Sequence, residues 1–131
     1  MNMSMQFLGG KNGIVIFLNK MKFGRFAENL VCKFLEIKNF KIIKRNWWLK
    51  KYGEIDIIAY KNNCYYFIEV KALKNNINFD PSVNYNKLKK ERFHNLINYY
   101  VNKYHLDKFT AGLITVQKIN KKIKIKFFKN V

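Results

Sequence analysis

The stretch GEIDIIAYKNNCYYFIEVKAL, residues 53–73, decides how this chain folds. Two segments rich in Ile, Val, Phe and Tyr, residue types that favour strands, surround a central pair of asparagines. Asparagine tolerates positive φ, so Asn62 and Asn63 predict a two-residue turn between antiparallel strands. This turn pairs Lys61 with Cys64 and sets the register of every later pair in the hairpin.

The predicted register brings acidic side chains together. Asp56 falls opposite Glu69, and Glu54 falls opposite Lys71. Opposed residues share one face of a sheet, with Cβ atoms about 4.5–5.5 Å apart. Two carboxylates at that distance repel each other unless one is protonated or a cation lies between them. A slip of a single residue would move Glu69 to the other face.

Carboxylate oxygens in this arrangement suit Mg²⁺ or Mn²⁺. We therefore expect the metal between Asp56 and Glu69, with Lys71 beside it to orient an attacking water or to offset charge on a phosphate. The chemistry that fits best is phosphodiester hydrolysis. The structural alternative is a set of cross-strand ion pairs, because E-x-K triplets arise easily by chance in a lysine-rich chain.

Helical and strand patterns continue on both sides of the hairpin. Residues 22–38 predict an amphipathic helix, and residues 84–104 predict a second one. The inward positions expected are Phe26, Leu30, Phe34 and Ile37 in the first helix, and Leu88, Leu96, Ile97, Tyr100 and Val101 in the second. Further strands are expected at 40–48, 110–117 and 122–128, the last as an edge strand, and residues 74–82 read as a loop. The order predicts an α/β fold with a mixed sheet flanked by helices.

Charge points to the class of partner. The chain has 26 basic and 8 acidic residues, a formal charge of +18. Such an excess favours a polyanion, with nucleic acid first and DNA expected, although an AT-rich genome would also supply many lysines. The contacts expected are a basic helix face and one stacking aromatic residue: Lys87, Lys89, Lys90, Arg92 and Trp48.

Length and the remaining composition limit the other classes. At 131 residues the chain is expected to be one domain, residues 21–131, after a loose extension or mis-assigned start, residues 1–20. The apolar run at residues 14–18 is too short for a membrane span. Cys32 and Cys64 have no metal-ligand spacing and predict a reduced, cytoplasmic protein. An anionic membrane surface is a weaker alternative, because no segment joins a basic face to a free apolar face.

Four ordered motifs resemble the YraN family of small bacterial proteins. They are GRFAENLVCKFL at 24–35, RNWW at 45–48, GEIDIIA at 53–59 and FIEVK at 67–71. That family is placed in the restriction-endonuclease-like, PD-(D/E)XK superfamily, akin to archaeal Holliday-junction resolvases. The resemblance implies an α-β-β-β-α-β core, a DNA endonuclease acting on branched or single-stranded intermediates of recombination and repair, and a homodimer.

The same resemblance assigns roles to individual residues. Asp56 and Glu69 match the direct metal ligands and Lys71 the motif lysine. Glu28 matches a helix glutamate that approaches the metal through water. Glu54 matches a residue that supports the metal ligands without binding the ion itself.

Two departures from the family pattern affect substrate contacts. Leu73 stands where an arginine is common, and Lys87 and Lys90 both fit the usual helix lysine. A basic protein that binds nucleic acid on this scaffold without cutting it is the alternative function.

Overall fold

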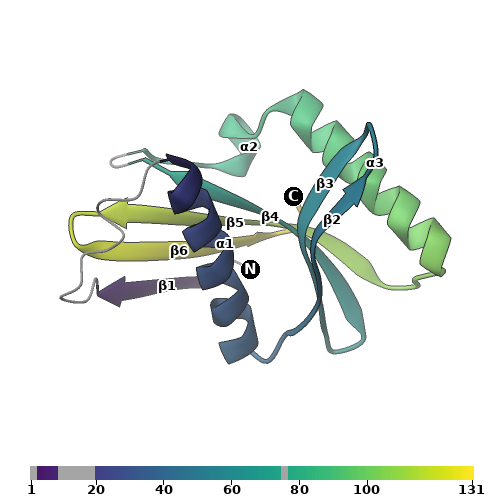
Figure 1. Cartoon of the computed structure of the whole chain (residues 1–131), viewed down its shortest axis with the longest axis horizontal. Coiled ribbons are helices and arrows are strands. Elements are labelled where there is room, and N and C mark those ends of the chain that lie inside the picture. The colour runs from purple at the N-terminus through teal and green to yellow at the C-terminus, as the bar shows by residue number, and fades with distance from the viewer. Residues whose placement is uncertain (1–2, 9–19, 75–76) are drawn as a thin grey trace.

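A mixed six-stranded sheet forms the centre of the protein, with strand order β1-β6-β5-β4-β3-β2 (Figure 1). The computed structural model describes residues 3–8, 20–74 and 77–131. The strands are β1 (Met3–Leu8), β2 (Lys41–Leu49), β3 (Gly53–Lys61), β4 (Cys64–Leu73), β5 (Phe109–Ile119) and β6 (Lys122–Lys129), and the helices are α1 (Lys20–Ile37), α2 (Pro81–Asn84) and α3 (Lys87–Tyr104). β4 and β5 are parallel, and the other pairings are antiparallel. The predicted α/β class and core order are confirmed.

Each face of the sheet is covered by one long helix (Figure 1). α1 buries Ala27, Val31, Phe34 and Leu35 completely against one face. Their spacing places them on a single apolar stripe, which explains why this segment folds as a helix on the sheet. α3 packs on the other face, where its side chains join Trp47 and residues of β3 and β4.

In each long helix, one residue near an end that was predicted to be buried is exposed. Ile37, the last residue of α1, is 63% exposed, and Leu88, the second residue of α3, is 62% exposed. Both predictions of burial were wrong, because the helical spacing of apolar residues extends to helix ends that do not contact the sheet. Phe93, which was not predicted to face inward, is 5% exposed and lies in the core between α3 and the sheet, which we call the α3 core.

The β3–β4 hairpin has the predicted turn and register. Asn62 and Asn63 have φ values of 50° and 61°, and Lys61 pairs with Cys64. The ladder continues to Ile57 and Ile68 and ends there. The predicted register is therefore confirmed from the turn as far as Ile57, which is next to Asp56 in the chain.

The edge of the sheet differs from expectation. β6 was predicted to be an edge strand, but it pairs with β5 on one side and with β1 on the other. The edge is β1, Met3–Leu8, which lies within the segment expected to be a loose extension. Residues 1–2 and 9–19 lie outside the described residues, so the proposed division at residue 21 stays a prediction.

None of the helices in the described part of the chain combines the length and the apolar character that crossing a membrane requires.

Candidate metal and nucleic-acid site

The hairpin strands part at Asp56, and this fork is the centre of the candidate site. β3 and β4 are paired from the turn to Ile57 and Ile68, whereas β4 continues beside β5 as far as Leu73. Figure 1 shows β2 and β3 turning away from β4 and β5 at this point. A strand that loses its neighbour exposes backbone N–H groups, which need another acceptor.

The Asp56 side chain supplies that acceptor. Its Oδ2 accepts a hydrogen bond of 2.8 Å from the backbone N–H of Val70. The alternation of side chains along β3 is also broken here. Ile57 lies in the core between α1 and the sheet, whereas both Ile55 and Ile58 lie in the core between α3 and the sheet. Asp56 is thus held in the gap between two strands.

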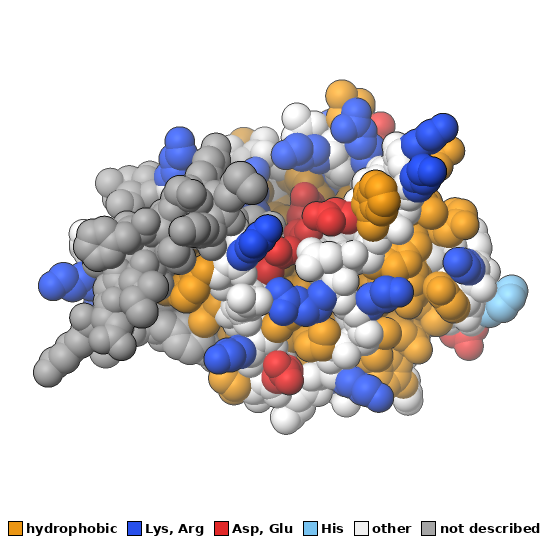
Figure 2. Space-filling view, in the orientation of Figure 1, with side chains coloured by type: hydrophobic (Ala, Val, Ile, Leu, Met, Phe, Trp, Pro, Cys, Tyr) orange, Lys and Arg blue, Asp and Glu red, His pale blue; other side chains and the backbone are white. Residues whose placement is uncertain are grey.

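The charge environment of Asp56 is unusual for so basic a protein. The pKa of Asp56 is raised to about 7: burial is the largest cause, the hydrogen bond from Val70 lowers it, and the neighbouring carboxylates of Glu28, Glu69 and Glu54 raise it. The three charged groups that raise the pKa of this carboxyl are all acids. In Figure 2, acidic side chains gather at the centre of this face with basic side chains around them.

Glu69 approaches the fork from the face opposite α1. It follows Phe67 by two positions on β4, and Phe67 lies in the α3 core. Its Oε2 accepts a hydrogen bond from the hydroxyl of Tyr85, which follows α2 directly. Burial, this hydrogen bond and the charges of Glu69 and Asp56 all raise the pKa of Tyr85. Tyr85 therefore stays protonated and holds one oxygen of Glu69.

Glu28 approaches the same fork from α1. Burial and the charge of Glu54 raise its pKa, whereas Arg45 and Arg25 lower it. Arg45 lies on β2, and its Nη2 donates a 2.8 Å hydrogen bond to Asn29 on α1. Glu28 is thus near the site, as the family resemblance implied, and Arg45 connects its helix to the sheet.

Neither predicted cross-strand pair, Asp56 with Glu69 or Glu54 with Lys71, belongs to the ladder, because the ladder ends at Ile57 and Ile68. Glu54 is exposed and pairs with Trp48 on β2. Lys71 is exposed, and its Nζ lies over the ring of Phe79, 5.2 Å from the centroid.

A pocket of about 750 Å³ lies beside Glu69. Its lining includes Lys71, Lys74, Tyr85 and Lys89. We call this space the Glu69 pocket. It brings an acid from the fork and three amines to one surface, a combination that suits a phosphate next to a metal.

The predicted nucleic-acid contacts divide around this pocket. Lys89 lines it, whereas Lys87 and Lys90 are exposed on the same helix without lining it. Arg92 lines a different pocket, together with Tyr99. Trp48 is 65% exposed on β2.

The donor set of the fork could hold a metal only through few protein ligands. Among the residues that the structure describes, no group of three His, Cys, Asp or Glu side chains stands ready to hold an ion. Mg²⁺ is commonly bound by one or two carboxylates, with water and substrate phosphate in the other positions. Asp56 and Glu69 could meet that requirement, because they are oxygen donors at one fork and the partly buried Asp56 lies among like charges.

Sequence reasoning missed Tyr85 and Arg45. Helix-capping signals would have helped to place Tyr85. Asp80 caps α2 ahead of Pro81, and Asn86 caps α3 by accepting hydrogen bonds from Leu88 and Lys89. These caps put Tyr85 at a fixed junction between two helices, but no local signal directs its hydroxyl toward Glu69.

The relatives of this chain share its central region. A UPF0102 protein from Sulfurovum sp. (strain NBC37-1) is 41% identical over 85 residues, covering 65% of this chain and 74% of the relative. A UPF0102 protein from Campylobacter fetus is 34% identical over 115 residues, covering 87% of this chain and 96% of the relative. The model of the uncharacterised protein family UPF0102 matches residues 27–123, which include every acid of the fork. The chain belongs to the uncharacterised protein family UPF0102.

Proposed function

We propose that this protein is a metal-dependent endonuclease that hydrolyses DNA phosphodiester bonds, with branched or single-stranded intermediates as substrates. The observation that carries the proposal is the fork, where the partly buried Asp56 lies among Glu28, Glu54 and Glu69 in a chain of charge +18. Such a concentration of acids costs free energy in the absence of a cation. Perturbed carboxylates of this kind gather at functional sites.

Under this proposal, Asp56 and Glu69 hold Mg²⁺ or Mn²⁺, and Glu28 completes the site through water. A bound ion supplies Lewis-acid stabilisation of the phosphate and a more acidic water. Tyr85 fixes the orientation of Glu69 by its hydrogen bond. Lys71 and Lys89, which line the Glu69 pocket, attract and position the substrate phosphates without reading the bases. A homodimer, as in resolvases, stays a prediction.

The test is cleavage of labelled single-stranded, duplex and four-way-junction DNA with Mg²⁺ or Mn²⁺. Asp56→Asn keeps an acceptor for the Val70 N–H but removes the charge, so we expect cleavage to fall by at least about 100-fold. Glu69→Gln should give a loss of similar size. Asp107→Asn and Glu36→Gln, which change exposed acids outside the Glu69 pocket, are matched controls and should cleave like the wild type. Cleavage that persists in Asp56→Asn would overturn the assignment.

A second function, binding of nucleic acid without hydrolysis, is favoured by the position of Lys71, whose ammonium is engaged with the ring of Phe79. In that case no substrate is cut with either metal, while binding remains strongly dependent on salt. The acids of the fork then act as structural groups, and adding Mg²⁺ does not change the thermal stability of the wild type.

A further inference from the structure

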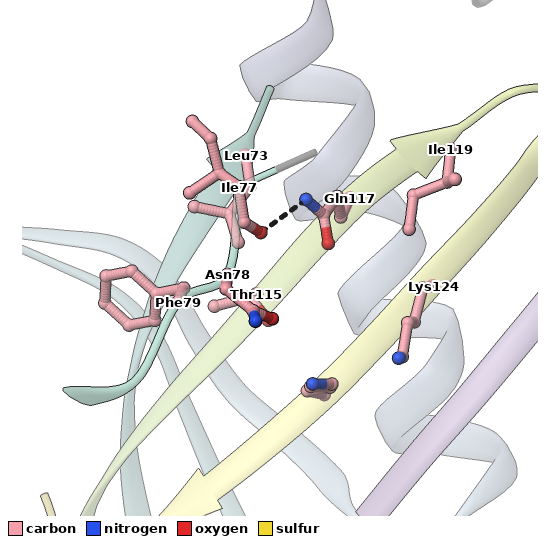
Figure 3. Close-up of a pocket in the computed structure, with 9 residues that line it drawn as sticks. Leu73, Ile77, Asn78, Phe79, Thr115, Gln117, Ile119 and Lys124 are labelled. Carbon is pink, nitrogen blue, oxygen red and sulfur yellow. Dashed lines mark hydrogen bonds between the residues drawn. The ribbon is translucent and has the colours of Figure 1, made fainter. Parts of the chain in front are cut away.

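A second pocket lies on the same face of the sheet as Glu69, over β5 and β6 (Figure 3). Its volume is about 310 Å³. Thr115 and Gln117 of β5 and Lys124 and Lys126 of β6 line it, and the segment around Phe79 forms a wall. We call this space the lysine pocket. Its lining within the described chain contains no acid.

Strand register aligns the lysine pocket with the Glu69 pocket. Lys71 on β4 is level with Thr115 on β5, which is level with Lys126 on β6. Residues level with one another in neighbouring strands project from the same face, and strands lie about 4.8 Å apart. Lys71 and Lys126 therefore lie at two ends of one row that crosses three strands.

Gln117 fixes the wall of the lysine pocket. Its side chain is 8% exposed, and its Nε2 donates hydrogen bonds to the carbonyl oxygens of Lys74 (3.0 Å) and Ile77 (2.7 Å). Figure 3 shows the second of these bonds, from Gln117 on β5 to Ile77 above it. A wall held in this way is formed before a ligand arrives, which lowers the entropic cost of binding.

The charge inside the lysine pocket calls for an anion. Lys124 and Lys126 are both partly buried and stand two positions apart on one strand, about 7 Å along the backbone. Two ammonium groups that share a face repel each other, and an anion between them removes that cost. Thr115 adds a hydroxyl donor at the floor, where it is 2% exposed.

The two pockets adjoin each other, because Leu73 and Ile77 line both. We propose that the lysine pocket binds a backbone phosphate of a nucleic-acid strand whose neighbouring segment lies in the Glu69 pocket. The strand then crosses the sheet from β4 to β6 along the Lys71–Lys126 row. This inference rests on the nucleic-acid partner of the proposed function and adds the direction in which the strand leaves the fork.

The test compares two double variants that lose the same charge. Lys124→Gln/Lys126→Gln removes both amines of the lysine pocket, whereas Lys41→Gln/Lys44→Gln removes two exposed amines of β2 that line neither pocket. Binding of a fluorescent single-stranded oligonucleotide is measured by anisotropy in EDTA over a range of NaCl concentrations. Each lost phosphate contact lowers the slope of log K against log salt by about 0.7 for single strands.

We expect the slope of log K against log salt to fall by about 0.7 in the lysine-pocket variant, as for the loss of one phosphate contact. The β2 variant should keep the wild-type slope. Asp56→Asn should also keep the slope, although the proposed function predicts that it loses cleavage. An unchanged slope in the lysine-pocket variant, with binding and cleavage intact in the wild type, would overturn this inference alone. Failure of the wild type to bind nucleic acid would overturn both proposals.

A small anion is the other source of the same chemistry, and inorganic phosphate distinguishes it. Thermal-shift titration with phosphate is run on the wild type and the lysine-pocket variant. The proposal expects weak stabilisation in the wild type and a large effect of the variant on DNA binding. Phosphate stabilisation that is lost in the variant while the DNA slope is unchanged would identify a small-anion site and overturn the strand path.

Discussion

Asp56 makes a structural hydrogen bond, but its negative charge is unfavourable where it lies. Its carboxylate accepts the Val70 N–H where β3 and β4 part, and burial with three neighbouring acids raises its pKa to about 7. A structural cap alone needs only an acceptor, which an asparagine also provides. The ionised acid costs stability in the folded protein, so its presence suits a site that takes up a cation.

The stability of the metal-free protein should therefore depend on the charge of Asp56. The pKa is raised in the folded state, so the stability that the protonated acid contributes is lost as the pH rises from about 4 to about 7. We expect the melting temperature of Asp56→Asn to exceed that of the wild type by a margin that grows over this range, reaching at least about 3 °C. Thermal unfolding in EDTA measures it.

Asp107→Asn is the matched control, because Asp107 is exposed. Its melting temperature should stay parallel to that of the wild type between about pH 4 and pH 7. A parallel curve for Asp56→Asn as well would show that the Asp56 carboxyl is ionised without cost. Adding Mg²⁺ above pH 7 should stabilise the wild type and leave Asp56→Asn unchanged, because the ion binds the folded, ionised form.

Tyr85 acts through Glu69. Tyr85→Phe removes one hydroxyl and leaves the ring, so we expect a loss of about 1–3 kcal/mol in the free energy of unfolding by urea. Glu69 also loses its fixed orientation, and the Mg²⁺ concentration at the midpoint of a thermal-shift titration should rise by about tenfold. Tyr52→Phe, at a side chain 69% exposed, is the control. An unchanged Mg²⁺ midpoint in Tyr85→Phe would leave Tyr85 with a structural role only.

At the scale of elements, the β3–β4 hairpin positions the whole site. Its turn keeps Asn62 and Asn63 at positive φ, and its ladder delivers Asp56 and Glu69 to the fork. α1 brings Glu28 from one side of the sheet, and the α2–α3 junction brings Tyr85 from the other. The fork is thus assembled from segments that are far apart in the chain.

The turn should tolerate glycine better than alanine. Asn63 has a φ of 61°, a conformation that costs an ordinary L-residue about 1–2 kcal/mol. We expect Asn63→Ala to lose about 1 kcal/mol in urea unfolding, while Asn63→Gly stays near the wild type. Equal stability of the two variants would show that the turn can change its conformation without cost.

At the scale of the molecule, the charges divide between a small acidic centre and a basic surround. The net charge of +18 attracts polyanions over a distance, and the fork concentrates acids within a single face (Figure 2). The Glu69 pocket and the lysine pocket open on the same side of the sheet and share Leu73 and Ile77. This surface suits an extended phosphate backbone.

Binding should therefore depend on salt and be indifferent to sequence. The contacts proposed are amines to phosphates, which position a strand but do not read its bases. We expect oligonucleotides of equal length and unrelated sequence to bind with affinities within about threefold, and every affinity to fall steeply as NaCl increases. Anisotropy titrations check both points. A strong preference for one sequence would require base contacts that this surface does not supply.

The sequence by itself determined what local patterns control. The Asn62–Asn63 turn defined the hairpin register from Lys61 and Cys64 to Ile57 and Ile68, because side chains alternate with a period of two along paired strands. Helical periodicity found both long helices, although Ile37 and Leu88 showed that it does not reveal where a helix leaves its sheet.

Only the tertiary structure decided where the hairpin opens, how Tyr85 meets Glu69, and that β1 covers β6. The family resemblance assigned Glu28 to the site, but its approach to Asp56 depends on how α1 packs on the sheet. Each of these contacts joins residues distant in the chain. Their geometry follows from packing and sheet twist, which no periodicity of a single segment encodes.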